Sequence, residues 1–382
     1  MKTFRTFTLC LAAALSMKSG LAQTYVYVLI PGTGTYAYDV SSDGKLASIK
    51  GSPFPTAPQR AGGVAGTNGS FYVTYGDRVA TEEHLFSYEV LSNGAIGKLV
   101  SKINPGLYSG SVCGPMSSAE LDHTGSFVYT LIPSGLDGEC NAFQTFQISK
   151  TGELTFKGST NTDTTNWNGD NFSLPSVTRN ERFGYSLSGA GGSFCCEFNF
   201  FSRESTGVLN LFDGSETDPV SESGPSNPYL PGSNPTSDST NHLAIGLGLE
   251  FGTSNEQLAS YTVDSQGNIS STNTWENMPS LASPGGDMKL DPTGKILAVP
   301  TGTGVQFFHF NGASPITAFT GVIGTSGFVN EVAWDTHGHL YAQNGASGRM
   351  HVYAVTSTSV KEMPGSPTVI ANNQGSFVLR SK

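Results

Sequence analysis

The sequence predicts an all-β protein, a seven-bladed β-propeller with four-stranded antiparallel blades, closed by a C-terminal strand that joins the N-terminal blade. Three observations predict this fold. A strand-turn-strand pattern recurs along the chain, glycine and proline are spread over its whole length, and an unpaired half-blade lies at each end. Helical periodicity is absent from the sequence, so short strands joined by turns account for the pattern.

The recurring pattern is an aromatic-rich strand, a polar turn that usually closes on glycine, and a short strand that starts with an apolar residue. It occurs seven times, at intervals of about 45 to 60 residues, which is a spacing typical of propeller blades. The copies are "YAYDVSSDGKL" (36–46), "FSYEVLSNGAI" (86–96), "FQTFQISKTGEL" (143–154), "FNFFSRESTGVL" (198–209), "ASYTVDSQGNI" (259–269) and the looser "VQFFHFNGASPI" (305–316) and "MHVYAVTSTSV" (350–360).

Further strands precede these copies. One strand lies directly before each repeat, as in "SFYVTYG", "SFVYTLI" and "KILAVPT", and it follows a turn such as "DHTG", "DPTG" or "DTHG". A shorter strand comes before that turn, as in "SSAEL", "GDMKL" and "NEVAW". Four strands in each of seven copies predict seven blades.

The two ends of the chain predict how the ring closes. The first copy begins at its second strand, residues 25–30, and lacks an inner strand, whereas "SFVLR" (376–380) is a strand without a blade. If the last strand supplies the missing inner strand of the first blade, no open sheet edge remains.

Residues 1–22 are expected to be a secretory signal peptide, which leaves residues 23–382 as one propeller domain. Lys2 and Arg5 precede the apolar run "FTLCLAAAL", and a small-residue exit ends at Ala22. A membrane helix is the alternative, but it needs roughly 20 apolar residues, and Lys18 lies shortly after the run. We therefore expect a secreted or periplasmic protein.

Charge and hydropathy restrict the partners. Removing Lys2, Arg5 and Lys18 leaves 17 basic against 30 acidic residues, a net charge of −13. A nucleic-acid binder would be basic, so we expect no nucleic-acid partner. The mature sequence has no apolar run long enough for a membrane span. The expected partner of this monomer is an extracellular protein, a glycan or a small molecule.

Several segments carry a resemblance to a known family. They are "YVYVLI" (25–30), "FYVTYG" (71–76), "GSPFP" (51–55) with its echo "GSPTV" (365–369), and "LDPTGKILAV" (290–299). With them the mature chain resembles, over essentially its whole length, the secreted lactonase-like seven-bladed β-propellers with YVTN-type repeats. The resemblance implies a bacterial exported protein, some of whose relatives act as lactonases or lactone-forming cyclases. The Arg and His pattern of that family at the inner-strand starts is matched here only by "PQRAGG".

Two long connections are expected to open onto one face of the ring. They cover residues 214–240 and 159–175, and loops of this length inside a compact domain are often functional. Tyr108, Trp167 and Tyr229 would supply stacking surfaces for a sugar or a peptide at this face. The alternative is that these rings only hold the loops in place.

Four cysteines of the mature chain are expected on the same face, in neighbouring blades. An even number in an exported protein indicates disulfides. We favour a Cys113–Cys140 bridge and a vicinal Cys195–Cys196 bridge, with the crossed pairings left open. A zinc cluster is the alternative, but no histidine occurs at ligand spacing after them, so no metal site is predicted.

The inner strands should line the central channel. Alignment of their turns places Glu120, Asp287, Lys289 and Glu331 at comparable positions, with Arg60 near the mouth. Carboxylates beside one or two cations can transfer protons or hold an ion such as Ca²⁺, so Arg60, Glu120, Asp287 and Glu331 are the candidate catalytic residues and Lys289 a candidate ligand contact. The alternative is a solvated lining without chemistry. His123 and His337, at the other end of these strands, are interpreted as structural.

Two classes of function fit these observations. The first is an exported binding or scaffold propeller that acts through its looped face. The second is a lactonase-like hydrolase with its site at the channel mouth. The sequence has no "GxSxG", "HExxH" or phosphate-binding loop, and it favours the binding module over the enzyme.

The disulfides give a first test. Peptide mapping of the unreduced protein should recover one peptide pair joined through Cys113 and Cys140 and one peptide with Cys195 and Cys196 bridged, because both pairs are close in the predicted fold. Four free thiols would contradict both bridges. Peptides that join Cys113 or Cys140 to Cys195 or Cys196 would show that the crossed pairing is correct instead.

Overall fold

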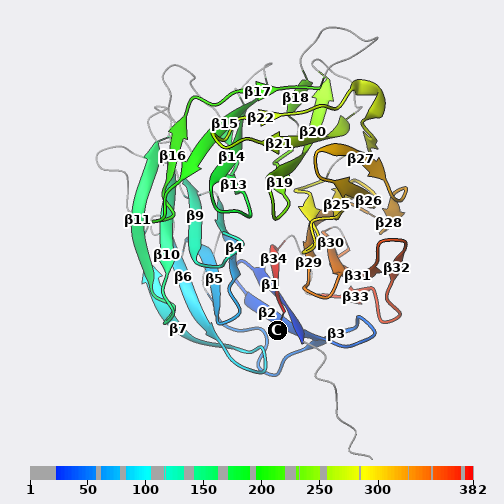
Figure 1. Ribbon diagram of the computed structural model, residues 1–382. Helices are drawn as coiled ribbons and strands as arrows, with labels where there is room; N and C mark the ends of the chain where they lie inside the picture. Colours follow the sequence, from blue (N-terminus) through cyan, green and yellow to red (C-terminus); the bar gives the residue numbers. More distant parts are fainter. Residues whose placement is uncertain are drawn as a thin grey trace, which may run out of the picture.

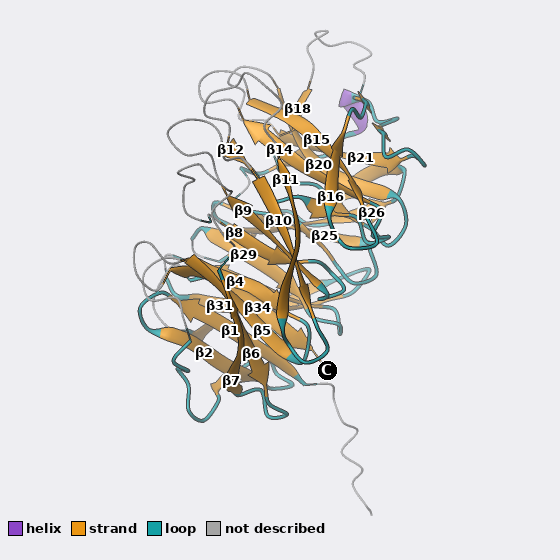
Figure 2. Ribbon diagram, turned by 90° about the vertical axis from the view of Figure 1, so that its left-hand side faces the viewer, coloured by secondary structure: helices purple, strands orange, loops and turns teal. Residues whose placement is uncertain are grey.

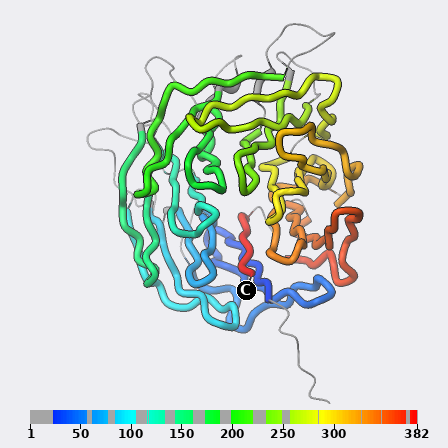
Figure 3. The backbone as a smooth tube through the Cα atoms, in the orientation of Figure 1, coloured from blue at the N-terminus to red at the C-terminus, as the bar shows by residue number. Residues whose placement is uncertain are grey.

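The computed structural model describes most of the chain from Gln23 to Ser381. The described residues are 23–56, 62–77, 83–104, 116, 118–132, 142–161, 171–189, 195–219, 229–231, 233–249, 256–283, 285–325, 327–345, 347–370 and 375–381. They form seven separate β-sheets arranged as blades in a ring around a common axis (Figures 1 and 3). The predicted seven-bladed propeller is confirmed.

Blades 1 to 3 are four-stranded and antiparallel. From the channel outward, blade 1 has β34 (Phe377–Ser381), β1 (Thr24–Ile30), β2 (Gly34–Val40) and β3 (Leu46–Ser48). Blade 2 has β4 (Gly62–Thr67), β5 (Phe71–Asp77), β6 (Glu83–Val90) and β7 (Ile96–Ile103). Blade 3 has β8 (Ser118–Leu121), β9 (Phe127–Ile132), β10 (Ala142–Ile148) and β11 (Leu154–Asn161).

Blades 4 and 5 add short strands to this plan. In blade 4 the inner position is shared by β12 (Asn171–Phe172) and β13 (Ser176–Val177), followed by β14 (Phe183–Gly189), β15 (Cys195–Arg203) and β16 (Leu209–Phe212). In blade 5, β18 (Tyr229–Pro231) and β19 (Thr236–Ser237) share it, followed by β20 (His242–Leu249), β21 (Glu256–Val263) and β22 (Ile269–Ser270). β17 (Glu216–Thr217) pairs in parallel with β22, and β23 (Ser280–Leu281) pairs antiparallel with β21. In the chain, the 3-10 turn η1 (Trp275–Asn277) lies between β22 and β23 (Figure 2).

Blades 6 and 7 each carry one extra strand beside the third strand. Blade 6 has β24 (Lys289–Leu290), β25 (Ile296–Thr301), β26 (Gly304–Asn311), β27 (Ser314–Ala318) and the extra β28 (Ile323–Gly324). Blade 7 has β29 (Val329–Trp334), β30 (His339–Asn344), β31 (Arg349–Val355), β32 (Val360–Glu362) and the extra β33 (Thr368–Val369). The extra strands lie on the connections that lead out of each blade.

The two ends of the chain complete blade 1 together. β34 pairs antiparallel with β1, from Thr24 opposite Ser381 to Val28 opposite Phe377, and the two lie side by side in red and blue in Figure 1. The predicted closure is therefore confirmed. Because β34 fills the inner position, β1 is paired on both sides and blade 1 has the same four-stranded plan as blades 2 and 3.

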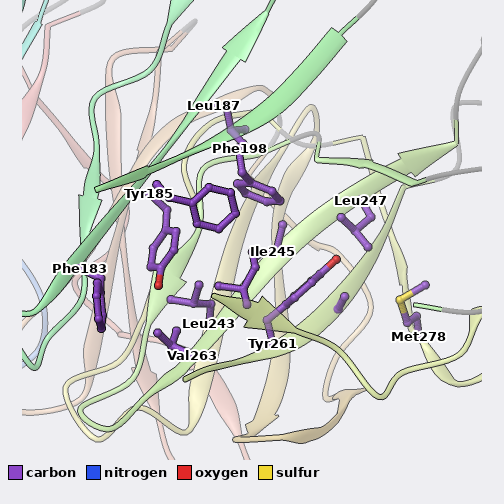
Figure 4. Packing of buried hydrophobic residues seen from close by; sticks show 13 residues of the cluster. Phe183, Tyr185, Leu187, Phe198, Leu243, Ile245, Leu247, Tyr261, Val263 and Met278 are labelled. Atoms are coloured by element: carbon purple, nitrogen blue, oxygen red, sulfur yellow. The ribbon is translucent and has the colours of Figure 1, made fainter. Parts of the chain in front are cut away.

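The apolar core lies at the seams between blades. Among the described residues it forms seven clusters, and each cluster joins two adjacent blades. Figure 4 shows the seam between blades 4 and 5, where Phe183, Tyr185 and Phe198 meet Ile245 and Tyr261. A blade buries both of its faces only when it has a neighbour on each side, so the ring is stable as a whole.

Most seams share one specific contact. The residue at the start of a blade's second strand places its ring on a glycine in the turn between the third and fourth strands of the next blade. The pairs are Tyr25 on Gly94, Phe71 on Gly152, Phe127 on Gly207, Phe183 on Gly267 and His242 on Gly312. In three seams a tyrosine two residues further on also donates its hydroxyl to the carbonyl oxygen of that glycine, from Tyr27, Tyr129 and Tyr185 at 2.9, 3.0 and 3.0 Å.

An aspartate fixes most turns between the first and second strands. The Oδ1 atom of Asp291 accepts the backbone N–H groups of Lys295 at 2.7 Å and Ile296 at 2.8 Å, and Asp122 does the same for Ser126 and Phe127. Asp238 and Asp335 use the histidine that comes after each turn as an additional partner. These turns hold each inner strand at a defined height along the channel.

The glycine contact can be tested at one seam. Gly207 has φ = 86°, and a Cβ there would overlap the Phe127 ring, whereas Gly69 has φ = 85° and a Cβ would meet no atom within 4 Å. Gly207→Ala should lower the free energy of unfolding by about 2–4 kcal/mol and Gly69→Ala by about 1–2 kcal/mol, because only the first adds a steric overlap to the backbone cost. Urea denaturation of both variants measures the difference, and equal losses would exclude the ring contact as its source.

Candidate active site

Four charged residues of the described part of the chain lie in or just before three inner strands at the channel. Glu120 lies in β8, Lys289 in β24 with Asp287 two residues before it, and Glu331 in β29. Glu120 and Lys289 each stand two residues before the aspartate of their turn, and Asp287 and Glu331 each stand four residues before theirs. Equal distances from the turn place these side chains at matching heights, so blades 3, 6 and 7 bring them together.

Lys289 is the cation at the centre of this group. Its Nζ lies 3.3 Å from Glu120 Oε1, and the two side chains remain 37% and 50% exposed to water in the channel. The Glu120 carboxylate raises the pKa of Lys289 above its usual value, and the negative charges of Asp287 and Glu331 act in the same direction against the effect of burial. Lys289 therefore stays positively charged across the physiological pH range.

Glu331 has a strongly perturbed carboxyl group. Burial raises the pKa of Glu331 to about 7, and repulsion from Asp287 and Glu120 adds to the shift. The backbone N–H of Phe377, 3.0 Å from Oε2, and the Lys289 ammonium act in the opposite direction. At neutral pH this carboxyl is present in both protonation states, which is the condition for accepting and returning a proton.

Two neutral groups complete the surroundings. Asn234 donates from Nδ2 to Asp287 Oδ1 at 3.1 Å. Burial raises the pKa of the Tyr75 hydroxyl, and the nearby charges of Glu331 and Glu120 raise it further. Tyr75 from blade 2 and Asn234 from blade 5 therefore extend the polar group around much of the ring, and sequence analysis identified neither residue.

A pocket of about 200 Å³ opens beside this group. Glu120, Asp287, Lys289 and Asn234 line it together with residues of blades 3 to 6. Arg179, at the far end, donates from its guanidinium to the carbonyl oxygens of Leu290, Asp291 and Pro292, each at 3.2 Å. Because Arg179 belongs to blade 4 and these carbonyl oxygens to blade 6, its side chain connects the two blades beside the pocket.

His123 also lines the pocket, on its floor, and it is tied to the neighbouring blade. Its Nε2 lies 3.0 Å from Glu181 Oε1, and Glu181 Oε2 lies 2.7 Å from the guanidinium of the buried Arg203. Glu181 has φ = 61° at a turn position that glycine occupies in "DHTG" and "DPTG". These ion pairs compensate the backbone strain and join blades 3 and 4. His337 faces Asp335 at 3.8 Å within its own turn.

Several residues singled out in the sequence lie outside the described residues. They are Arg60, Tyr108, Cys113, Cys140 and Trp167. For Tyr229, Cys195 and Cys196 the structure describes only the backbone, in β18 and β15. The disulfides and the stacking surface remain predictions.

Within the described part of the chain, no group of three or more His, Cys, Asp or Glu side chains is arranged to hold a metal ion. A search of the same residues also finds no helix with the length and hydropathy needed to cross a membrane.

Comparison with known proteins identifies the fold but no family. No family model and no curated protein sequence matches the chain. Among solved structures, a "putative 6-phosphogluconolactonase" from Bacteroides fragilis has a TM-score of 0.64 at 12% identity and covers 95% of this chain and 99% of its own. A protein of the same description from Bacteroides uniformis has a TM-score of 0.65 at 12% identity, with 94% and 99% covered. A protein from Lactobacillus plantarum has a TM-score of 0.64 at 13% identity, with 95% and 100% covered.

These structures share the seven-bladed fold with this chain along nearly the whole of both chains. Identities of 12–13% extend the likeness to the architecture alone, so function has to be argued from the residues of the channel.

The perturbed carboxyl predicts a pH dependence of stability. The folded-state pKa of Glu331, about 7, lies above the usual 4.5, so its contribution is complete below pH 4.5 and is lost as the pH rises through 7. Relative to wild type, Glu331→Gln should therefore gain on the order of 1–2 kcal/mol between pH 4.5 and pH 8, since channel water screens part of the effect. Urea denaturation at both pH values measures this, and a pH-independent difference would refute the raised pKa.

Proposed function

We propose that the protein is an exported lactonase-like hydrolase that opens small, uncharged lactones in its central channel. The observation that carries this proposal is that Glu331, with its pKa near 7, and the cationic Lys289 interact in the channel. Lys289, together with Glu120 and Asp287, also lines the pocket of about 200 Å³. A base that titrates at neutral pH and a fixed positive charge are the two groups that ester hydrolysis by water requires.

In the proposed reaction Glu331 acts as the general base. Its carboxylate takes a proton from a water molecule as the water oxygen attacks the lactone carbonyl carbon. The negative charge that forms on the carbonyl oxygen faces the Lys289 ammonium, which Glu120 holds at 3.3 Å. The ring C–O bond then breaks, and the leaving oxygen takes the proton back from Glu331, which yields a hydroxy acid.

The charge balance of the site selects the substrate. Glu120, Asp287 and Glu331 place three carboxyl groups around one lysine. A phosphorylated lactone would need several cations around its phosphate, and this group is net negative. Uncharged lactones therefore fit better than the phosphorylated substrate named for the two Bacteroides proteins. Export of the chain, which residues 1–22 predict, also favours an extracellular substrate.

The proposal reverses the preference that the sequence gives to a binding or scaffold module. That reading depends on the long connections 159–175 and 214–240 and on Tyr108 and Trp167. Tyr108 and Trp167 lie outside the described residues, as do 162–170, 220–228 and 232 of these connections. The channel residues, in contrast, come together with defined partners. If the protein binds a glycan or peptide and hydrolyses no lactone, the binding-module hypothesis is favoured again.

The test is hydrolysis of a panel of uncharged γ- and δ-lactones by the purified protein. The value of kcat/KM should rise with pH through an apparent pKa near 7. Glu331→Gln and Lys289→Met should each lower kcat/KM by about 10²–10⁴-fold, because each removes one group from the transition state.

The matched control is Glu153→Gln, an exposed residue in the turn before β11 of blade 3, which should leave kcat/KM unchanged. Hydrolysis that survives Glu331→Gln would remove the general base from the proposal. If the protein hydrolyses none of the lactones in the panel, the proposed hydrolase activity is refuted.

A further inference from the structure

The seam between blades 6 and 7 departs from the ring-on-glycine packing found at five of the other seams. The second strand of blade 6 begins with Ile296, at the position that Phe127 and Phe183 occupy in their blades. The facing turn of blade 7 is Thr-Ser-Thr-Ser, residues 356–359, closed by a hydrogen bond from the Thr356 N–H to the Ser359 carbonyl at 2.9 Å. This turn has no glycine to receive a ring, and blade 6 offers none.

A groove of about 500 Å³ lies at this place. Ile296 and Val355 contribute apolar surface to it, and Thr356 and Ser357 border it from the glycine-free turn. At the other seams a side chain fills the corresponding space, including the seam between blades 7 and 1, where Met363 packs on Gly44. The groove is therefore the space left by the missing ring.

Among the titratable residues that line the groove, the solvent-exposed ones are basic. Its titratable lining groups are Asp291, Lys295, His309 and His337. Asp291 is only 7% exposed, and its carboxylate accepts hydrogen bonds from Thr293, Lys295 and Ile296 within its own turn. The exposed Lys295 has no ion-pair partner in the described part of the chain.

The two histidines border this positive end. His309 packs on Phe319 with ring centroids 4.3 Å apart, and His337 is 34% exposed at the rim. Both rings can donate hydrogen bonds to an acceptor. No carboxylate other than that of Asp291 is among the lining groups.

We propose that this groove binds a flat aromatic anion, with the ring against Ile296 and Val355 and the acidic group beside Lys295. The aromatic body is inferred from the ring that this seam lacks, and the negative charge from the unpaired lysine and the two histidines. The groove is formed by the turns at the far end of the inner strands, so it is separate from Glu331, and the inference does not depend on the proposed hydrolase.

Titration calorimetry with 2-naphthoate on the full mature chain tests the site, and 2-naphthamide is the uncharged ligand control. Naphthoate should bind at one site, and the amide should bind about tenfold or more weakly because it lacks the charge. Lys295→Glu should weaken naphthoate binding at least about tenfold. The control is Lys361→Glu in blade 7, where the lysine is exposed but does not line the groove, and it should leave naphthoate binding unchanged.

A second pair of variants tests the location. Ser357→Trp places a bulky ring at the border of the groove and should abolish binding, whereas Thr358→Trp, the adjacent exposed residue of the same turn that does not line the groove, should retain it. The proposal is overturned if wild type binds no naphthoate, if the amide binds equally well, or if Ser357→Trp binds like Thr358→Trp.

Discussion

The packing of a ring on a glycine of the next blade is the contact on which the rest of this structure depends. It occurs at five seams, from Tyr25 on Gly94 to His242 on Gly312, and at three of them a tyrosine hydroxyl bonds to the same glycine. Each contact allows the next blade to approach closely and fixes how it is rotated. Seven blades close into a ring only if the steps between neighbours are nearly the same, so the width of the channel and the positions of its lining residues depend on the seams.

The charged group in the channel is a consequence of that regularity. The inner strands of blades 3 and 6 end at turns that are held by a side-chain oxygen, of Asp122 and Asp291, and Asp335 holds the corresponding turn of blade 7. Counting back from the turn therefore gives the height of a side chain in the channel. Glu331 and Lys289 meet because their strands belong to adjacent blades with the same turn geometry. The low number of lysines and arginines among the described channel residues then makes the charge of Lys289 important to each carboxyl group near it.

The sequence was sufficient to predict the seven blades and the closing strand, and it assigned Glu120, Asp287, Lys289 and Glu331 to comparable positions on their inner strands, because turns, strand periodicity and distances from a turn are local properties. It could not identify Arg179, Tyr75 or Asn234. Arg179 reaches from blade 4 to carbonyl oxygens of blade 6, and Tyr75 approaches Glu331 from blade 2. Which blades face each other across the channel depends on the assembled ring. The same holds for Glu181, whose unusual backbone is explained only by its contacts with His123 and Arg203.

The pairing of β34 with β1 also determines when this chain can finish folding. The partner of the first strand to leave the ribosome is among the last residues to be made, so blade 1 stays incomplete for nearly the whole of synthesis. Interior blades can form earlier, but the circle has no closed state before the C terminus is free.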